Sequence, residues 1–122
     1  MNVTNLQKTR DYIAQHPGAY DQSNWMHDCG TPACVAGAAV AVCGGTLLDE
    51  DRCITSDGEN WLLPDHAEKL LALTADQRAA MFTAAPYDSF TGNFDLEPVT
   101  AAEALAMLDH AIEHDEVRWP DR

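Results

Sequence analysis

The sequence predicts one small, mainly α-helical domain: a single-domain bundle of about five helices with a short β-hairpin. A chain of 122 residues can bury one sizeable core but not two. Apolar residues make up 46% of it and aromatic residues only 7%, so much of the core must come from small side chains, which favour closely packed helices. Three Thr-x-x-Gln or Thr-x-x-Glu patterns have the spacing of the capping box that begins a helix. They are Thr4–Gln7, Thr74–Gln77 and Thr100–Glu103.

The first half of the chain is expected to contain two helices. The first covers residues 5–15 and ends before Pro17. For the second, Thr31–Pro32 forms a good N-cap and first turn and Gly44–Gly45 a stop, so the helix is expected over 33–43. Because this segment has small or apolar residues on every side, we expect it to be the central, buried helix.

The second half begins with the hairpin. Asp57–Gly58 is flanked by short apolar runs, which indicates a tight β-hairpin within residues 46–64. A helix then begins at Pro64. Two further helices, over about 75–84 and about 100–115, follow the second and third capping boxes.

The net charge excludes one large class of partners. The chain has 7 Lys and Arg against 20 Asp and Glu, a formal net charge of −13 at pH 7. Such a surface repels nucleic acid, so direct DNA or RNA binding is not expected, whereas a basic protein surface would attract it. Because the sequence has neither an apolar run of about 18 to 20 residues nor a signal-peptide pattern, no membrane partner is expected and the protein is predicted to be cytoplasmic. Its 4 cysteines are then expected to be reduced.

Acidic residues concentrate toward the C-terminal end. No Lys or Arg occurs between Arg78 and Arg118. In the last predicted helix, Asp109, Glu113 and Glu116 are spaced four and three residues apart, so they are expected to share one outer face. Like charges at this spacing cost a few tenths of a kcal/mol per pair, so a contribution to stability does not explain them.

These acidic residues suggest a binding surface. We interpret the last helix and the loop before it as an anionic surface that occupies a basic groove on a nucleic-acid-handling protein. In charge and size the chain is analogous to phage-encoded inhibitors such as some anti-CRISPR proteins. The favoured function is therefore a non-enzymatic, acidic protein-binding module that needs no cofactor. Its binding residues are predicted to be Asp95, Glu97, Glu103, Asp109, Glu113 and Glu116.

A second hypothesis comes from the stretch His27–Gly37, which reads HDCGTPACVAG. Cys29 precedes the predicted start of the central helix, where the helix dipole and free N–H groups stabilise a thiolate. The turn Asp28-Cys29-Gly30 before an Ala- and Val-rich helix resembles the start of the papain-like bacteriocin-leader peptidases. That resemblance implies a cysteine hydrolase with Cys29 as its nucleophile. The strand that carries the histidine in that family has no counterpart here, so His66 or His27 would have to serve as the base.

A zinc site is a further alternative. His27, Cys29 and Cys34, with Cys43 or Cys53 as a fourth ligand, have side chains that zinc prefers. The spacing argues against zinc, because Cys29 and Cys34 are not followed by a second close pair. In the simplest interpretation the stretch is a structural turn, and its cysteines are small buried residues that let helices approach closely.

The same stretch is similar to a group of small uncharacterised bacterial and phage proteins with a Cys-Gly-Thr-x-x-Cys-x-Ala-Gly core. In this chain the core comprises Cys29, Gly30, Thr31, Cys34, Ala36 and Gly37. The similarity implies a small helical domain and assigns no activity or site residue.

Overall fold

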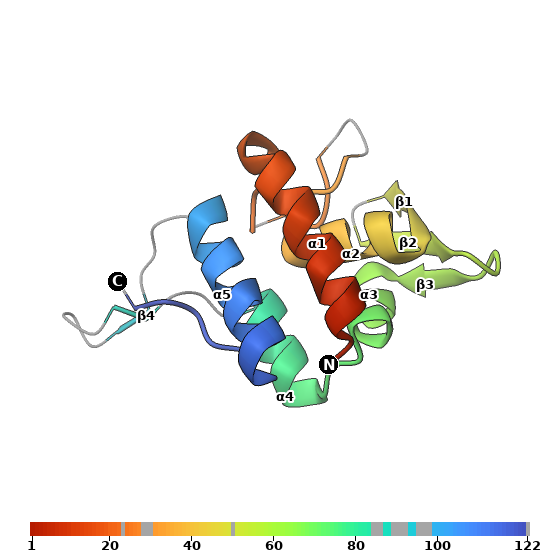
Figure 1. The fold of residues 1–122 in the computed structure, drawn as a ribbon. Coiled ribbons are helices and arrows are strands. Elements are labelled where there is room, and N and C mark those ends of the chain that lie inside the picture. Colours follow the sequence, from red (N-terminus) through yellow and green to blue (C-terminus); the bar gives the residue numbers. More distant parts are fainter. Residues whose placement is uncertain are drawn as a thin grey trace.

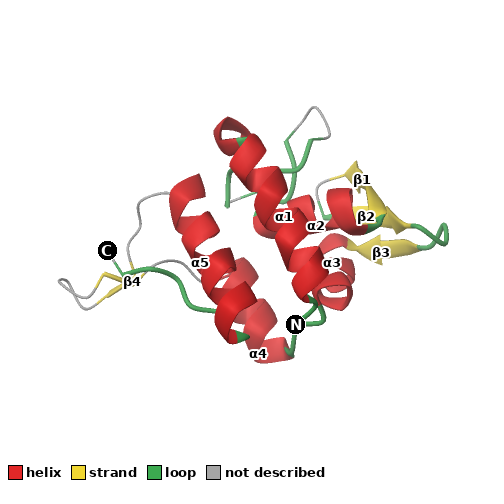
Figure 2. Ribbon diagram, viewed as in Figure 1, coloured by secondary structure: helices red, strands yellow, loops and turns green. Residues whose placement is uncertain are grey.

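A computed structural model describes residues 1–22, 24–27, 31–49, 51–83, 87–88, 93–94 and 99–121. Within these residues the chain forms five α-helices and a three-stranded antiparallel sheet (Figures 1 and 2). The mainly helical character and the five helices are as predicted, but a three-stranded sheet replaces the single hairpin that the sequence indicated. The helices are α1 (Val3–Gln15), α2 (Val35–Cys43), α3 (Leu63–Leu71), α4 (Ala75–Arg78) and α5 (Ala101–His114).

Two of the three predicted capping boxes are confirmed. The Thr74 hydroxyl accepts the backbone N–H of Gln77 at 3.2 Å, and the Thr100 hydroxyl accepts that of Glu103 at 3.1 Å. In both boxes the Gln or Glu side chain accepts the N–H of the threonine in return. The helix predicted over 75–84 is divided, because the α-helical turn α4 continues as a π-helical turn over Ala79–Thr83.

The two N-terminal helices begin at residues other than those predicted. Asn2, and not Thr4, caps α1, because the Asn2 side-chain oxygen accepts the N–H of Asn5 at 3.0 Å. α2 begins two residues later than expected, since Cys34 takes the N-cap position. The Cys34 Sγ accepts the N–H of Gly37 at 3.5 Å, as a serine hydroxyl would in this position.

The predicted hairpin at Asp57–Gly58 is confirmed, and it belongs to a larger sheet. β2 (Arg52–Thr55) and β3 (Asn60–Leu62) pair in antiparallel fashion across this turn. A further strand that sequence reasoning missed, β1 (Gly45–Asp49), pairs with β2 on its other side, so the order is β1-β2-β3. Its apolar residues are adjacent leucines that do not alternate with polar ones, so the pattern of a half-buried strand is absent.

β4 (Tyr87–Asp88) and β5 (Asn93–Phe94) form a separate two-stranded antiparallel sheet.

The core lies between α1, α2, α3, α5 and the sheet. α1 runs beside α5 and also packs against α2 and α3, while α2 packs against α3 and β1 (Figure 1). As predicted, α2 is central, but burial on every side holds only for Val35–Val40, because Ala41 is exposed. Among the described helices none combines the length and apolar character needed to cross a lipid bilayer.

Candidate functional site

Two short segments of the stretch before α2 pair with each other. The N–H of His27 donates to the Thr31 carbonyl at 2.9 Å, and Met26 forms an antiparallel bridge with Pro32. Thr31 and Pro32 therefore pair with His27 and Met26, and are not the N-cap and first turn of the helix as predicted. Cys29, the candidate nucleophile, lies outside the described residues.

The Cys34 thiol is buried at the start of α2. Its side chain is 2% exposed, accepts the N–H of Gly37 and directs its S–H toward the Trp25 carbonyl at 3.9 Å. Burial raises the pKa of Cys34 to about 11, although the N–H groups of the first helical turn act in the opposite direction. At neutral pH Cys34 is a thiol, so it has a structural role and no nucleophilic one.

We expect Cys34 to resist alkylation in the folded protein. A pKa of about 11 leaves about one Cys34 side chain in a thousand ionised at pH 8, and the side chain is buried from the reagent. Alkylation by iodoacetamide, followed by peptide mass spectrometry, should therefore be at least about 100-fold slower in native buffer than in concentrated urea. Partly buried Cys43 serves as the comparison within the same molecule.

Equal rates of Cys34 alkylation in native buffer and in urea would contradict this structural role. The same measurement tests the hydrolase hypothesis, because a Cys29 that reacts faster when folded than when unfolded would support a thiolate nucleophile.

Backbone carbonyls engage both candidate bases. The His27 Nε2 contacts the Ala19 carbonyl, and the His66 Nε2–H donates to the Gly44 carbonyl at 2.8 Å. Gly44 follows the last residue of α2, whereas Thr31 comes before the first, and the nine residues of α2 span about 13 Å. His66 therefore lies at the opposite end of α2 from the segment that adjoins Cys29.

Those proposed zinc ligands that lie in the described part of the chain do not gather into a cluster. Among the described residues no group of three or more His, Cys, Asp or Glu side chains is placed to hold a metal ion. Cys34 and His27 are each engaged by the backbone, and the Cys43 Sγ–H donates to the Asn5 carbonyl at 3.5 Å. Cys53 is buried in the sheet. The described residues thus add nothing in favour of zinc.

The tertiary structure brings cations to two carboxylates near the end of α5. The Arg10 Nε–H of α1 donates to Asp109 at 2.9 Å, and the N-terminal ammonium of Met1 lies 2.8 Å from Asp115. Two carboxylates of this acidic region therefore have cationic partners that lie outside the stretch between Arg78 and Arg118. Arg10 and Asp109 are 99 positions apart, so no local sequence pattern could have indicated the pair.

The predicted row of acidic residues along one helix face is also wrong at its C-terminal end. α5 ends at His114, and Asp115 caps it with a left-handed φ of 54°, so Glu116 does not continue the face that carries Asp109 and Glu113. Glu116 instead accepts a hydrogen bond from the His110 Nε2–H at 3.0 Å, which lowers the pKa of the Glu116 carboxyl group.

The other predicted binding residues divide into three groups. Glu113 is 76% exposed, and the cation-forming group nearest to it is His114, at 3.9 Å. Glu103 is partly buried and belongs to the capping box of α5, so it already has a structural role. Asp95 and Glu97 lie outside the described residues.

Comparison with known proteins identifies one family and no activity. A family model described as a family of unknown function (DUF6197) matches residues 2–114. Neither the curated proteins nor the solved structures include a significant match. The resemblance to bacteriocin-leader peptidases gains no support from these comparisons, so function has to be argued from the residues themselves.

Proposed function

This chain belongs to the DUF6197 family, whose function is unknown, and we propose from its own residues that it is a non-enzymatic binding protein that docks on a basic protein surface. The observation that carries this proposal is the placement of Glu113 and Glu116. Their side chains are 76% and 63% exposed at the C-terminal end of α5. Within the described part of the chain, neither has a Lys or Arg within 4 Å.

A structural role does not account for these two carboxylates. Asp109 joins α5 to α1 and Glu103 caps α5. Among the described residues, the ion-pair partners of Glu113 and Glu116 are histidines of their own segment, and Arg118 adds a longer-range attraction to Glu116. Exposed ion pairs of this kind contribute little to stability, because solvent screens them. We therefore assign Glu113 and Glu116 to the contact surface and exclude Asp109 and Glu103 from its essential residues.

The net charge of the chain indicates that the partner has a basic surface. A net charge of −13 repels nucleic acid and steers the protein toward clusters of Lys and Arg. Such clusters are typical of surfaces that bind phosphates, so a nucleic-acid-handling protein fits best. In this proposal the acidic end of α5, defined by Glu113 and Glu116, competes with nucleic acid for a basic groove.

Reversal of the two charges tests the proposal. The double variant Glu113→Lys and Glu116→Lys should capture the basic partner from a lysate of the native host at least about tenfold less well than the unchanged protein. The captured proteins are quantified by mass spectrometry at low and at high salt, because an electrostatic complex weakens as salt rises. An added DNA or RNA oligonucleotide should displace the partner.

A matched control separates the position of the charges from their number. Asp49→Lys with Asp51→Lys makes the same change of net charge where β1 ends and β2 begins, and both side chains are exposed there. This control should retain the partner. If both double variants lose it equally, or if neither does, the acidic end of α5 is not the contact surface.

A further inference from the structure

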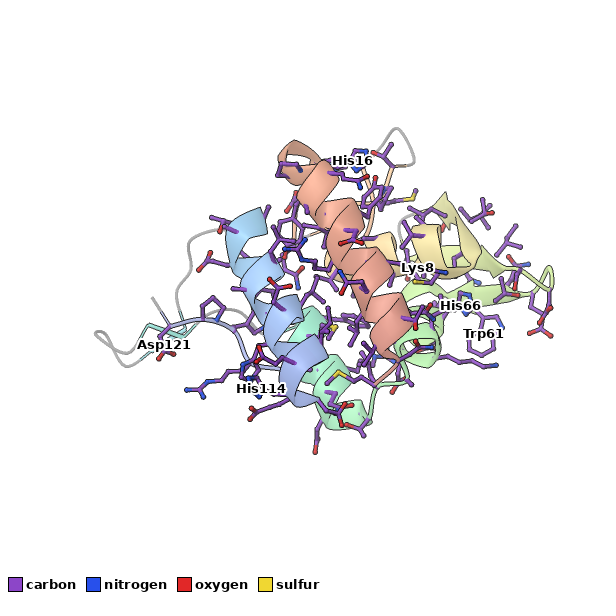
Figure 3. All side chains as sticks on the ribbon, in the orientation of Figure 1. Lys8, His16, Trp61, His66, His114 and Asp121 are labelled. Atoms are coloured by element: carbon purple, nitrogen blue, oxygen red, sulfur yellow. The ribbon has the colours of Figure 1, made fainter. Side chains whose placement is uncertain are left out.

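A pocket of about 350 Å³ lies on the side of the molecule that carries the sheet. It is bounded by the N-terminal end of α1, the hairpin between β2 and β3, and α3. Figure 3 shows Trp61 and His66 next to each other in this region, away from His114 at the end of α5. Its volume is at the lower end of the range for small-molecule sites, so it suits a small ligand.

His66 lines this pocket and carries a buried hydrogen-bonding atom that no partner uses. Because the Gly44 carbonyl can only accept, the His66 Nε2 carries the hydrogen, and Nδ1 of the neutral ring is an acceptor. The Cδ2–Nε2 edge of the ring faces Gly44 and Gly45, so Nδ1 lies on the opposite edge. His66 is 6% exposed, and its Nδ1 is the one buried side-chain nitrogen or oxygen without a hydrogen-bond partner in the described part of the chain. Buried polar atoms are nearly always paired, so this nitrogen indicates a missing donor.

The indole of Trp61 provides an apolar wall of the pocket. Its Nε1–H donates to Glu59 at 2.9 Å, and its ring lies edge-on to His66 with the ring centroids 5.6 Å apart. The Lys69 ammonium lies 5.0 Å from the centroid of the indole ring. Trp61 is only partly buried, so a ligand can reach it from the pocket.

The mixed charges around the pocket favour an uncharged ligand over an ion. The carboxylates of Asp57 and Glu59 and the overall negative charge oppose a phosphate or a carboxylate ligand. Lys69 already lies over the indole ring, so it opposes a cationic ligand there. What remains is an uncharged molecule with hydrogen-bond donors and an apolar face, which is the chemistry of a sugar ring.

We propose that this pocket binds a small uncharged polyhydroxylated molecule of monosaccharide size. One hydroxyl donates to the His66 Nδ1, and the C–H face of the ring packs against Trp61. Other hydroxyls donate to Asp57 and accept from Ser56, whose side chain is exposed beside the pocket. Because Nδ1 is not exposed to solvent, a small movement of the pocket lining accompanies binding.

Titration of the full chain with glucose, galactose, mannose or N-acetylglucosamine tests this site by NMR. At least one sugar should shift the Trp61 indole and His66 ring-nitrogen signals in a saturable manner, with a Kd on the order of 1 mM. The 15N chemical shift of the His66 Nδ1 should change, because this unprotonated nitrogen accepts a hydrogen bond from the sugar. Trp61→Ala should weaken this binding at least about tenfold, whereas Trp61→Phe, which keeps an aromatic ring, should retain most of it.

Leu62→Ala is the matched control, because Leu62 neighbours Trp61 in β3, is 43% exposed and does not line the pocket. It should leave the affinity unchanged. If Trp61→Ala does not fold, Ser56→Ala, at an exposed position, should weaken binding about threefold. The proposal is overturned if no sugar gives saturable shifts at these signals. It is also overturned if inorganic phosphate or spermidine binds there instead, or if folded Trp61 and Ser56 variants bind as well as the unchanged protein.

Discussion

Gly37→Ala is expected to destabilise the fold by about 3 kcal/mol, near the upper end of the range for overpacking a core. A Cβ at this position would overlap the Trp25 carbonyl oxygen, which lies against the backbone of α2. That carbonyl cannot easily withdraw, because it accepts the N–H of Ala33 in the turn that precedes the helix. Urea denaturation followed by circular dichroism gives the change in the free energy of unfolding.

Gly18→Ala provides the control for the Gly37 substitution. A Cβ at Gly18 would meet nothing within 4 Å, and the backbone there does not have the positive φ that favours glycine. The substitution should change the free energy of unfolding by less than about 1 kcal/mol and in the stabilising direction, because alanine restricts the unfolded chain. If the Gly37→Ala variant unfolds at the same urea concentration as the unchanged protein, the result contradicts the close approach of the Trp25 carbonyl to α2.

Leu108→Ala should cost about 3 kcal/mol of stability. Leu108 belongs to the side of α5 that faces the core and is fully buried, so its truncation leaves a cavity among closely packed helices. Leu48→Ala in β1 removes the same atoms from a side chain that is 48% exposed, and its effect should stay within about 0.5 kcal/mol. Both values come from urea denaturation. Similar losses for the two variants would contradict the burial of this face of α5.

Much of the fold was predictable because its signals are local. The capping boxes at Thr74 and Thr100 and the turn at Asp57–Gly58 each involve residues no more than four positions apart, and all three are confirmed. The two wrongly predicted N-caps were each replaced by a nearby residue. Asn2 displaced Thr4 as a cap, and Cys34 took a position expected for Thr31, because a thiol can accept an N–H as a hydroxyl does.

The candidate site was less predictable, because its chemistry depends on neighbours that are distant in sequence. The composition indicated an acidic surface, but not that Arg10 would neutralise Asp109 or that Glu116 would leave the helix. His66 was considered as a catalytic base from residue type alone. Its burial and the free Nδ1 follow from the packing of α3 against the end of α2.

The amino-acid order already determined the helical character, the net charge and most helix boundaries, since these depend on composition and on contacts within about one turn. Only the folded chain decided which of the described carboxylates pair with an arginine and which ring nitrogen lacks a donor. Those properties arise where elements 22 to 99 positions apart meet, as His66 meets Gly44 and Arg10 meets Asp109. Burial and pairing at such contacts change the energy of a charge or a hydrogen bond by more than residue type does.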